Sequence, residues 1–272
     1  MPERMHAVRR KILPTLSIST LGVFAGIAAL PSAHAQAPAP AMQPAISEEA
    51  SAAVAQMSKT LLAPELSFTA RTIQVYLDES GQPLHIFHTM KVAARRPDRL
   101  KVEVAGDDGS RDLFYDGKTV SIFSRDSKAY AVTPAPGGIP SALRAVTEKL
   151  DLDLPLTNFY APSADQSLLR GVVAGWVAGT AKIDDVECQH LFFHQAAGTD
   201  LELWVERNST ARPHRLVVTY RSLPGQPNFI AEFTNWDSQA HASDSVFTFQ
   251  PPADAKQIAL TPAVAPAQQG RQ

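Results

Sequence analysis

The residues best suited to chemistry in this chain are a few histidines, two pairs of adjacent aspartates and one cysteine. His190 and His194 lie four residues apart in a strand-like run. A β-strand separates such positions by about 13 Å, which is too far for both side chains to bind one metal ion. His85 and His88 fall on opposite faces of another expected strand. The histidine spacing therefore predicts no metal site.

The aspartates and the cysteine do not favour catalysis either. Asp107-Asp108 and Asp184-Asp185 lie in expected turns, where adjacent side chains diverge and stay solvated. Cys188 lies in an apolar run without a neighbouring base, so we expect it to be a buried apolar residue. The chain also lacks a Gly-x-Ser-x-Gly elbow and a phosphate-binding glycine loop. We expect no catalytic residues, no cofactor and no enzymatic activity.

The first 35 residues have the pattern of a secretory signal peptide. The basic Arg9-Arg10-Lys11 precedes an apolar stretch, residues 12–30, and Ala33-His34-Ala35 has the small-x-small pattern of a cleavage site. An uncleaved membrane anchor is the alternative, because the apolar stretch is about long enough to cross a bilayer. The cleavage pattern and the Pro/Ala-rich segment after it favour removal. Arg9-Arg10 partly matches a twin-arginine signal, so the export route stays open.

Charge and cysteine content narrow the class of protein further. The net charge is −2, and removing residues 1–35, with four basic residues and one acidic residue, makes it −5. A mildly acidic protein has no electrostatic reason to bind nucleic acid. A single cysteine allows no intramolecular disulfide, so the core alone must stabilise the fold. We expect an exported monomer of a Gram-negative-type periplasm without a stable membrane anchor.

Composition divides the rest of the chain into three parts. Residues 36–46 form a Pro/Ala-rich linker, residues 47–260 one domain, and residues 261–272 a flexible tail. A helix should open the domain, because Ser47 can cap it and Glu48 and Glu49 suit its first turn.

Alternation of apolar and polar residues predicts about ten strands between Leu66 and Phe249. Asp116-Gly117 stands between two strand-like runs and predicts a type I′ hairpin. Residues 246–249 are expected to be the last strand. An antiparallel sheet of this size must curl or close to protect its edges and its apolar face.

One amphipathic helix interrupts the strands. Ile139, Leu143, Val146 and Leu150 recur with helical spacing, and Pro140 suits the first turn. The order is therefore a first antiparallel meander, a helix and a second meander. The helical stripe either packs as ordinary core or covers a cavity, and the spacing does not separate these alternatives.

Five segments resemble a family of exported bacterial proteins, the DUF2092 family of predicted periplasmic proteins. The segments are Phe114–Lys118, Asp184–Leu191, Leu203–Glu206, Arg212–Tyr220 and Phe247–Lys256. The resemblance spans roughly Val54 to Ile258. Asp185 is a departure, because the family pattern has glycine there. Asp tolerates the backbone conformation of such a turn.

That family resembles the LolA/LolB-like superfamily of lipoprotein carriers. The resemblance implies a mainly β (α+β) fold, namely one strongly curved antiparallel sheet, an unclosed β-barrel, with a few helices plugging the concave side. It also implies a lipid, acyl chain or lipoprotein bound in an apolar cavity. The alternative is a non-enzymatic accessory module of the envelope with a filled core and a protein partner.

If the carrier interpretation holds, the cavity lining comes from the helix stripe and from one face of the sheet. The expected ligand-binding residues are Leu143, Val146, Leu150, Ile86, Met90, Leu203 and Val218. The concave face cannot be derived from the sequence, because a register error of one residue exchanges the two faces.

Overall fold

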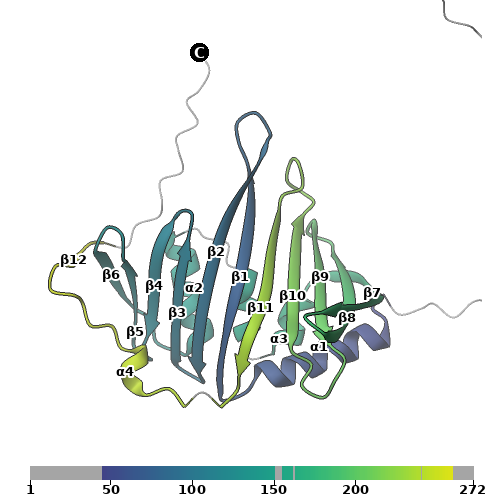
Figure 1. Ribbon diagram of the computed structural model, residues 1–272, viewed down its shortest axis with the longest axis horizontal. Coiled ribbons are helices and arrows are strands. Elements are labelled where there is room, and N and C mark those ends of the chain that lie inside the picture. The colour runs from purple at the N-terminus through teal and green to yellow at the C-terminus, as the bar shows by residue number, and fades with distance from the viewer. Residues whose placement is uncertain (1–44, 151–154, 162, 240, 260–272) are drawn as a thin grey trace, which may run out of the picture. The chain divides into compact units, whose positions relative to one another are not determined.

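The computed structural model describes residues 45–150, 155–161, 163–239 and 241–259. Within them, twelve strands form one sheet whose two edge strands do not meet (Figure 1). The strands are β1 (Glu65–Leu77), β2 (Pro83–Arg95), β3 (Arg99–Gly106), β4 (Gly109–Tyr115), β5 (Thr119–Ser124), β6 (Ala129–Pro134), β7 (Val172–Ile183), β8 (Val186–Gln195), β9 (Thr199–Glu206), β10 (Pro213–Tyr220), β11 (Asn228–Asp237) and β12 (Lys256–Gln257). The expected signal peptide and the tail from residue 261 lie outside the described residues.

The sheet consists of two antiparallel meanders joined side by side. Its order is β12-β6-β5-β4-β3-β2-β1-β11-β10-β9-β8-β7, and the antiparallel β1–β11 pair joins the meanders. The predicted unclosed sheet with a few helices is confirmed. The predicted strand at residues 246–249 is wrong, because a short helix, α4 (Asp244–Phe247), forms there. The last strand is β12, which pairs in parallel with β6.

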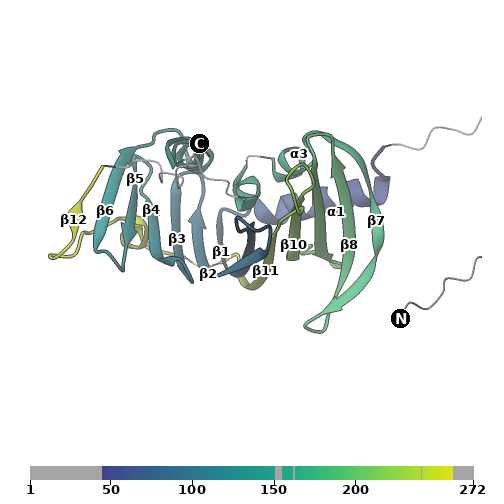
Figure 2. The same ribbon diagram turned by 90° about the horizontal axis from the view of Figure 1, so that it is seen from above.

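This topology places the helices between β6 and β7 on one face of the sheet. The chain leaves β6 near one edge and enters β7 at the opposite edge, so the connection must cross the whole sheet. It carries α2 (Ile139–Leu150), the 3₁₀ helix η1 (Pro155–Tyr160) and α3 (Ala164–Leu168). Figure 2 shows α2 beside β3–β5 and α3 beside β8–β10, both on the same side of the sheet. We call this helix-covered side the inner face.

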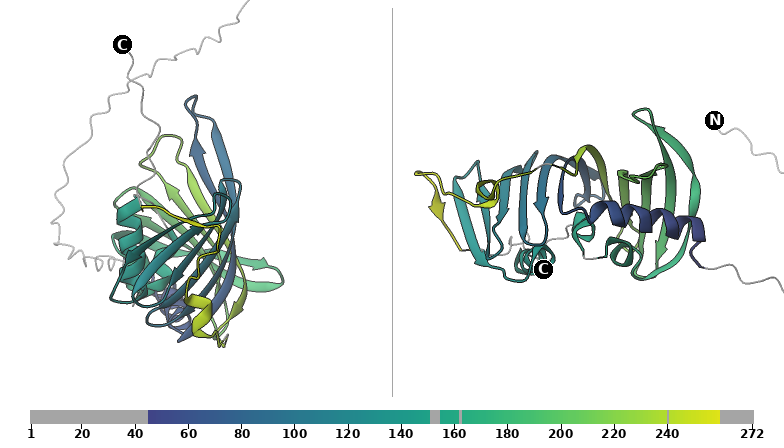
Figure 3. Two further views of the ribbon diagram at one scale, coloured as in Figure 1. Left: turned by 90° about the vertical axis from the view of Figure 1, so that its left-hand side faces the viewer. Right: turned by 90° about the horizontal axis from the view of Figure 1, so that it is seen from below.

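The first helix, α1 (Glu48–Leu61), also lies on the inner face, where it contacts β7 and β9 (Figure 3). Ser47 caps it as predicted, since its hydroxyl accepts the Ala50 N–H at 3.2 Å. The backbone just before the helix pairs with β7, where the Ser47 N–H donates to the Gly175 carbonyl at 2.9 Å. A side chain at Gly175 would meet the ring of Phe193, its partner on β8, at 2.5 Å, so glycine leaves room for this ring.

The turn at Asp116-Gly117 has a different geometry from the one predicted. At the β4–β5 turn only Gly117 has a positive φ, so the predicted type I′ turn at Asp116-Gly117 is wrong. The Asp116 carboxylate instead accepts the N–H groups of Lys118 and Thr119 at 2.9 and 2.8 Å. These bonds outweigh the effect of burial and keep the pKa of Asp116 below its ordinary value. The type I′ pattern of two positive φ angles occurs at Asp184-Asp185.

The inner face is apolar and forms one core with the helices. Its buried side chains include Phe68, Leu100 and Phe233 on the sheet and Met57 and Ile139 on the helices. Burying a large apolar side chain contributes roughly 1.5–3 kcal/mol. The amphipathic spacing of the helices therefore matters mainly through packing against the sheet.

The outer face, opposite the helices, is partly covered by the C-terminal segment. The Phe249 ring packs on Phe114, Phe123 and Tyr130, with ring centroids 5.3, 5.7 and 5.2 Å away. These three residues lie on β4, β5 and β6. The segment between α4 and β12 thus covers the aromatic part of the outer face.

Arg96 holds the helices at the end of the sheet opposite the β1–β2 turn, which we call the base. It follows β2, and its guanidinium donates to the carbonyls of Leu61 at 2.9 Å, Tyr160 at 3.2 Å and Phe159 at 3.4 Å. These carbonyls belong to the end of α1 and to η1. Burial lowers the pKa of Arg96 from its high ordinary value.

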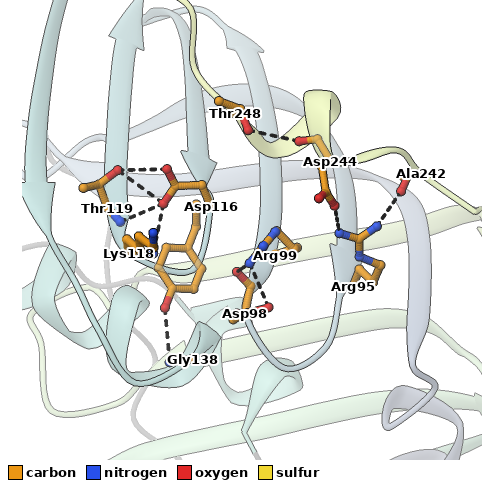
Figure 4. A network of polar contacts seen from close by, with 11 residues as sticks. Arg95, Asp98, Arg99, Asp116, Lys118, Thr119, Gly138, Ala242, Asp244 and Thr248 are labelled. Carbon is orange, nitrogen blue, oxygen red and sulfur yellow. Dashed lines mark hydrogen bonds and ion pairs between the residues drawn. The ribbon is translucent and has the colours of Figure 1, made fainter.

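Further polar contacts at the base hold the C-terminal segment and α2 (Figure 4). Arg95 donates to the Ala242 carbonyl at 2.9 Å and pairs with Asp244. The Gly138 N–H donates to the Tyr115 hydroxyl at 3.1 Å, which fixes the start of α2 against β4. The base is therefore closed by contacts between turns, helix ends and the C-terminal segment.

We expect Arg96→Met to lower the free energy of unfolding by about 2–3 kcal/mol, because unpaired buried acceptors each cost roughly 1–3 kcal/mol. Urea denaturation measures this loss. Arg207→Met is the matched control, since Arg207 pairs with the exposed Glu187 and such pairs contribute about 0–1 kcal/mol. Equal losses in the two variants would contradict the tethering role of Arg96.

Candidate functional site

The structure brings most of the residues predicted to bind a ligand into one layer. Leu143 and Val146 on α2 are 6% and 2% exposed, and Leu203 and Val218 on the sheet are 2% and 6% exposed. All four belong to the core cluster. The α2 stripe is therefore part of the buried core, as are the two sheet residues. A role in ligand binding stays a prediction for all of them.

The remaining predicted residues lie at the margin of this core or beyond it. Met90 is half-buried and packs against the core, and Ile86 shares its face of β2. Leu150 ends α2, and its side chain lies outside the described part of the structure. The sequence could not decide which face of the sheet these residues share. In the structure, Ile86, Met90, Leu203 and Val218 all lie on the inner face.

The inner-face residues of β2 become less buried toward the β1–β2 turn. Ala94 and Val92 are 6% and 4% exposed, Met90 and Ile86 are half-buried, and Leu84 is 51% exposed. Leu84 pairs with Tyr76 on β1, which is 56% exposed. In Figure 1 the β1–β2 hairpin rises beyond the neighbouring strands. The inner face is thus closed at its base and open toward this hairpin.

A half-buried apolar row crosses three strands in the register of Val92, next to this open region. Val102, Leu113 and Ile122 lie opposite one another on β3, β4 and β5 and pack against the core. This row was not among the residues predicted to bind a ligand. The alternation around Val102 and the hairpin turns between these strands are the signals that could have aligned it.

Charged groups lie at the open end of the inner face. The His88 ring on β2 contacts the Asp108 carboxylate at 2.7 Å, and Arg111 pairs with the same carboxylate at 3.1 Å. Burial raises the pKa of Asp108, but the His88 hydrogen bond and the Arg111 charge outweigh it, so the pKa lies below its ordinary value. An apolar surface with a charged margin suits a ligand that has an apolar body and a polar end.

The histidines of β8 form separate pairs with carboxylates. His190 contacts Glu202 at 2.8 Å, and His194 contacts Asp200 at 2.7 Å, both across the β8–β9 pair. In the described part of the chain, no group of three His, Cys, Asp or Glu residues could hold a metal ion. The Asp184-Asp185 pair is exposed in its turn, as the sequence predicts.

Cys188 lies within the second meander and is fully buried, so the prediction of a buried free cysteine is confirmed. Burial, helped by the nearby Glu206 charge, raises the pKa of its thiol to about 11. A thiol with such a pKa is a poor nucleophile at neutral pH.

The architecture defines the class of this protein, an unclosed, curved β-sheet with helices packed on its inner face. A family model described as "Predicted periplasmic protein (DUF2092)" matches residues 50–261. The chain belongs to this family, which confirms the predicted membership. No curated protein matches the chain.

Solved structures of similar architecture have low sequence identity. An uncharacterized conserved protein from Thermus thermophilus is 10% identical, with a TM-score of 0.47, covering 78% of this chain and 99% of its own. The lipoprotein LppX from Mycobacterium tuberculosis is 14% identical, with a TM-score of 0.46, covering 72% and 98%. A LolA superfamily protein from Nitrosomonas europaea is 10% identical, with a TM-score of 0.36, covering 74% and 97%.

The family description agrees with the predicted periplasmic location. No helix within the described residues has the length and apolar character that a membrane crossing requires.

We expect Cys188 in the folded protein to react with Ellman's reagent at pH 8 at least about a hundredfold more slowly than in urea. With a pKa of about 11, only about one thiol in a thousand is ionised at that pH. Thiol labelling followed by absorbance measures both rates.

The control carries Thr180→Cys in a Cys188→Ala background, because Thr180 is exposed on the adjacent strand β7. Its thiol should react at similar rates in the folded and unfolded states. Fast labelling of Cys188 in the folded protein would contradict its burial.

Proposed function

We propose that this chain is a non-enzymatic binding protein of the periplasm that holds a lipid, an acyl chain or the lipid part of a lipoprotein on its inner face. The proposal rests on one observation: an apolar surface becomes less buried along β2. On β2 the surface passes from 4% exposed Val92 through half-buried Met90 to 51% exposed Leu84. An acyl chain could extend the core along this strand and cover apolar surface that otherwise faces water.

The half-buried row on β3–β5 supports the same location. Val102, Leu113 and Ile122 continue the apolar surface from Val92, one register step from Met90, in the half of the sheet where α2 lies. The His88–Asp108–Arg111 cluster stands at the margin, where it could contact a polar head group. The proposed site is therefore the open part of the inner face on β2–β5, whereas Leu203 and Val218 belong to the buried core in the other meander.

Native mass spectrometry of protein purified under mild conditions tests the proposal directly. We expect a bound mass corresponding to a lipid, or uptake of an added fluorescent fatty acid. A clean ligand-free mass from several preparations, with no uptake of added acyl chains, would contradict the proposal. It would favour an envelope accessory module with a filled core, which a pull-down from envelope extracts would then test.

We expect Ile86→Glu to weaken fatty-acid uptake at least about tenfold, because a carboxylate beside the bound chain must lose its hydration. The variant should stay folded, since Ile86 is only half-buried near the open end. Leu143 and Val146 are less suitable positions, because an aspartate at these buried residues would unfold the protein. Fluorescence titration measures the affinity, and circular dichroism checks the fold.

The matched control for this variant is His85→Glu. His85 is exposed and adjacent on β2, and it points to the outer face, so the substitution adds the same group without touching the inner face. Its affinity should stay within about twofold of the unchanged protein. If both variants lose uptake equally, the acyl chain does not bind beside Ile86.

A further inference from the structure

The outer face carries a groove to which six adjacent strands contribute. A hollow of about 630 Å³ lies over β3, β2, β1, β11, β10 and β9, the central strands in Figure 1. Val217, one of its lining residues, stands between the buried Leu216 and Val218 on β10. The alternation of a β-strand therefore directs Val217 away from the core and to the outer face. The volume is in the range of small-molecule sites, about 300–1,000 Å³.

Charged and aromatic side chains form a row across one end of this groove. Trp204, Arg215, Glu232 and Arg71 lie opposite one another on β9, β10, β11 and β1. The Arg215 guanidinium donates to the Glu232 carboxylate at 2.7 and 3.1 Å. It also lies 5.4 Å from the centre of the Trp204 ring. The carboxylate of Glu232 is thus engaged by Arg215.

Arg71 is the cation of this row that has no partner of its own. It is exposed, and it makes no hydrogen bond or ion pair with any described residue. This row holds two guanidiniums and one carboxylate, and the carboxylate is paired with Arg215, so the charge of Arg71 is left over. A planar guanidinium with free donors suits a carboxylate, which it can bind through two parallel hydrogen bonds.

The next register of the same strands is apolar. Ile73, Val217 and Ile230 lie side by side on β1, β10 and β11 and line the groove. Phe87 borders them on β2 and is 51% exposed. An apolar floor therefore begins one register step away from the free cation.

The opposite end of the groove is less suited to an anion. Asp107 lies there, and its carboxylate accepts the Phe87 N–H at 3.0 Å. A ligand with one negative group at Arg71 and an uncharged body toward Phe87 fits this distribution better than a ligand with two charges.

One apolar part of the outer face is covered by another segment of the chain, and the other part is exposed. On β4–β6 the ring of Phe249 covers Phe114, Phe123 and Tyr130. Over the groove, Phe87 keeps half of its surface exposed. We propose that this groove is a second binding site, separate from the inner face, for an organic monoanion with an apolar body, such as a medium-chain carboxylate.

Fluorine NMR of full-length protein labelled with 5-fluorotryptophan tests this proposal. The chain has three tryptophans, and Trp→Phe substitutions assign their signals. Titration with decanoate should shift the Trp204 signal in a saturable way, because Trp204 lines the groove. Arg71→Gln should weaken this binding about tenfold or more, as expected for loss of a charge-assisted hydrogen-bond pair. The uncharged 1-decanol should leave the signal unchanged at the same concentrations.

Lys91→Gln is the matched control. Lys91 is an exposed cation on the same face, one register step from Arg71, and it does not line the groove. This variant should bind decanoate within about twofold of the unchanged protein. Ile86→Glu should also retain the Trp204 shift, so failure at the inner face is distinguished from failure at the groove.

Three outcomes would overturn the proposal. They are an unshifted Trp204 signal, equal effects of Arg71→Gln and Lys91→Gln, and an equal shift with 1-decanol. A Trp204 shift that depends on protein concentration without decanoate would assign the groove to a second copy of the chain, and would overturn the proposal as well.

Discussion

The central constraint on this fold is that a wide, open sheet with an apolar face must be covered. An unclosed sheet cannot bury its inner face against itself, as a small closed barrel does. The chain must therefore supply the cover from its connections. The path from β6 at one edge to β7 at the other carries α2, η1 and α3 across that face. The same topology that leaves the sheet open thus places helices where the apolar surface needs them.

Coverage by a few short helices is uneven, and this unevenness is where function can arise. The helices bury the base of the sheet, where Arg96 and Tyr115 hold them by hydrogen bonds to backbone groups. Toward the β1–β2 hairpin the same apolar strip becomes exposed. A binding surface of this kind needs no special catalytic chemistry. It requires only that the apolar residues of the sheet extend farther than the helices that pack on them.

The apolar parts of the outer face must also be covered or tolerate contact with water, but this face is less apolar than the inner face. Its aromatic part on β4–β6 is covered by Phe249 from the C-terminal segment. Its central part combines apolar residues with Arg71, Arg215 and Glu232 and stays accessible. Mixed polar and apolar surfaces tolerate exposure to water better than purely apolar ones. Such a surface can remain open in the free protein and still bind an amphipathic ligand.

The sequence by itself determined the elements of local origin. Capping by Ser47, the helical stripe from Ile139 and the alternation along the strands all act between residues close in the chain, so α1, α2, most strands and the two meanders could be predicted. Some local signals misled: the alternating residues 246–249 form a helix and a covering segment, because Phe247 and Phe249 find partners on other elements. The β1–β11 pairing, the face that the helices cover and the lack of a partner for Arg71 among the described residues were decided only by the tertiary structure. Each depends on strand register and on contacts between residues far apart in the chain, and a shift of one residue would exchange the two faces.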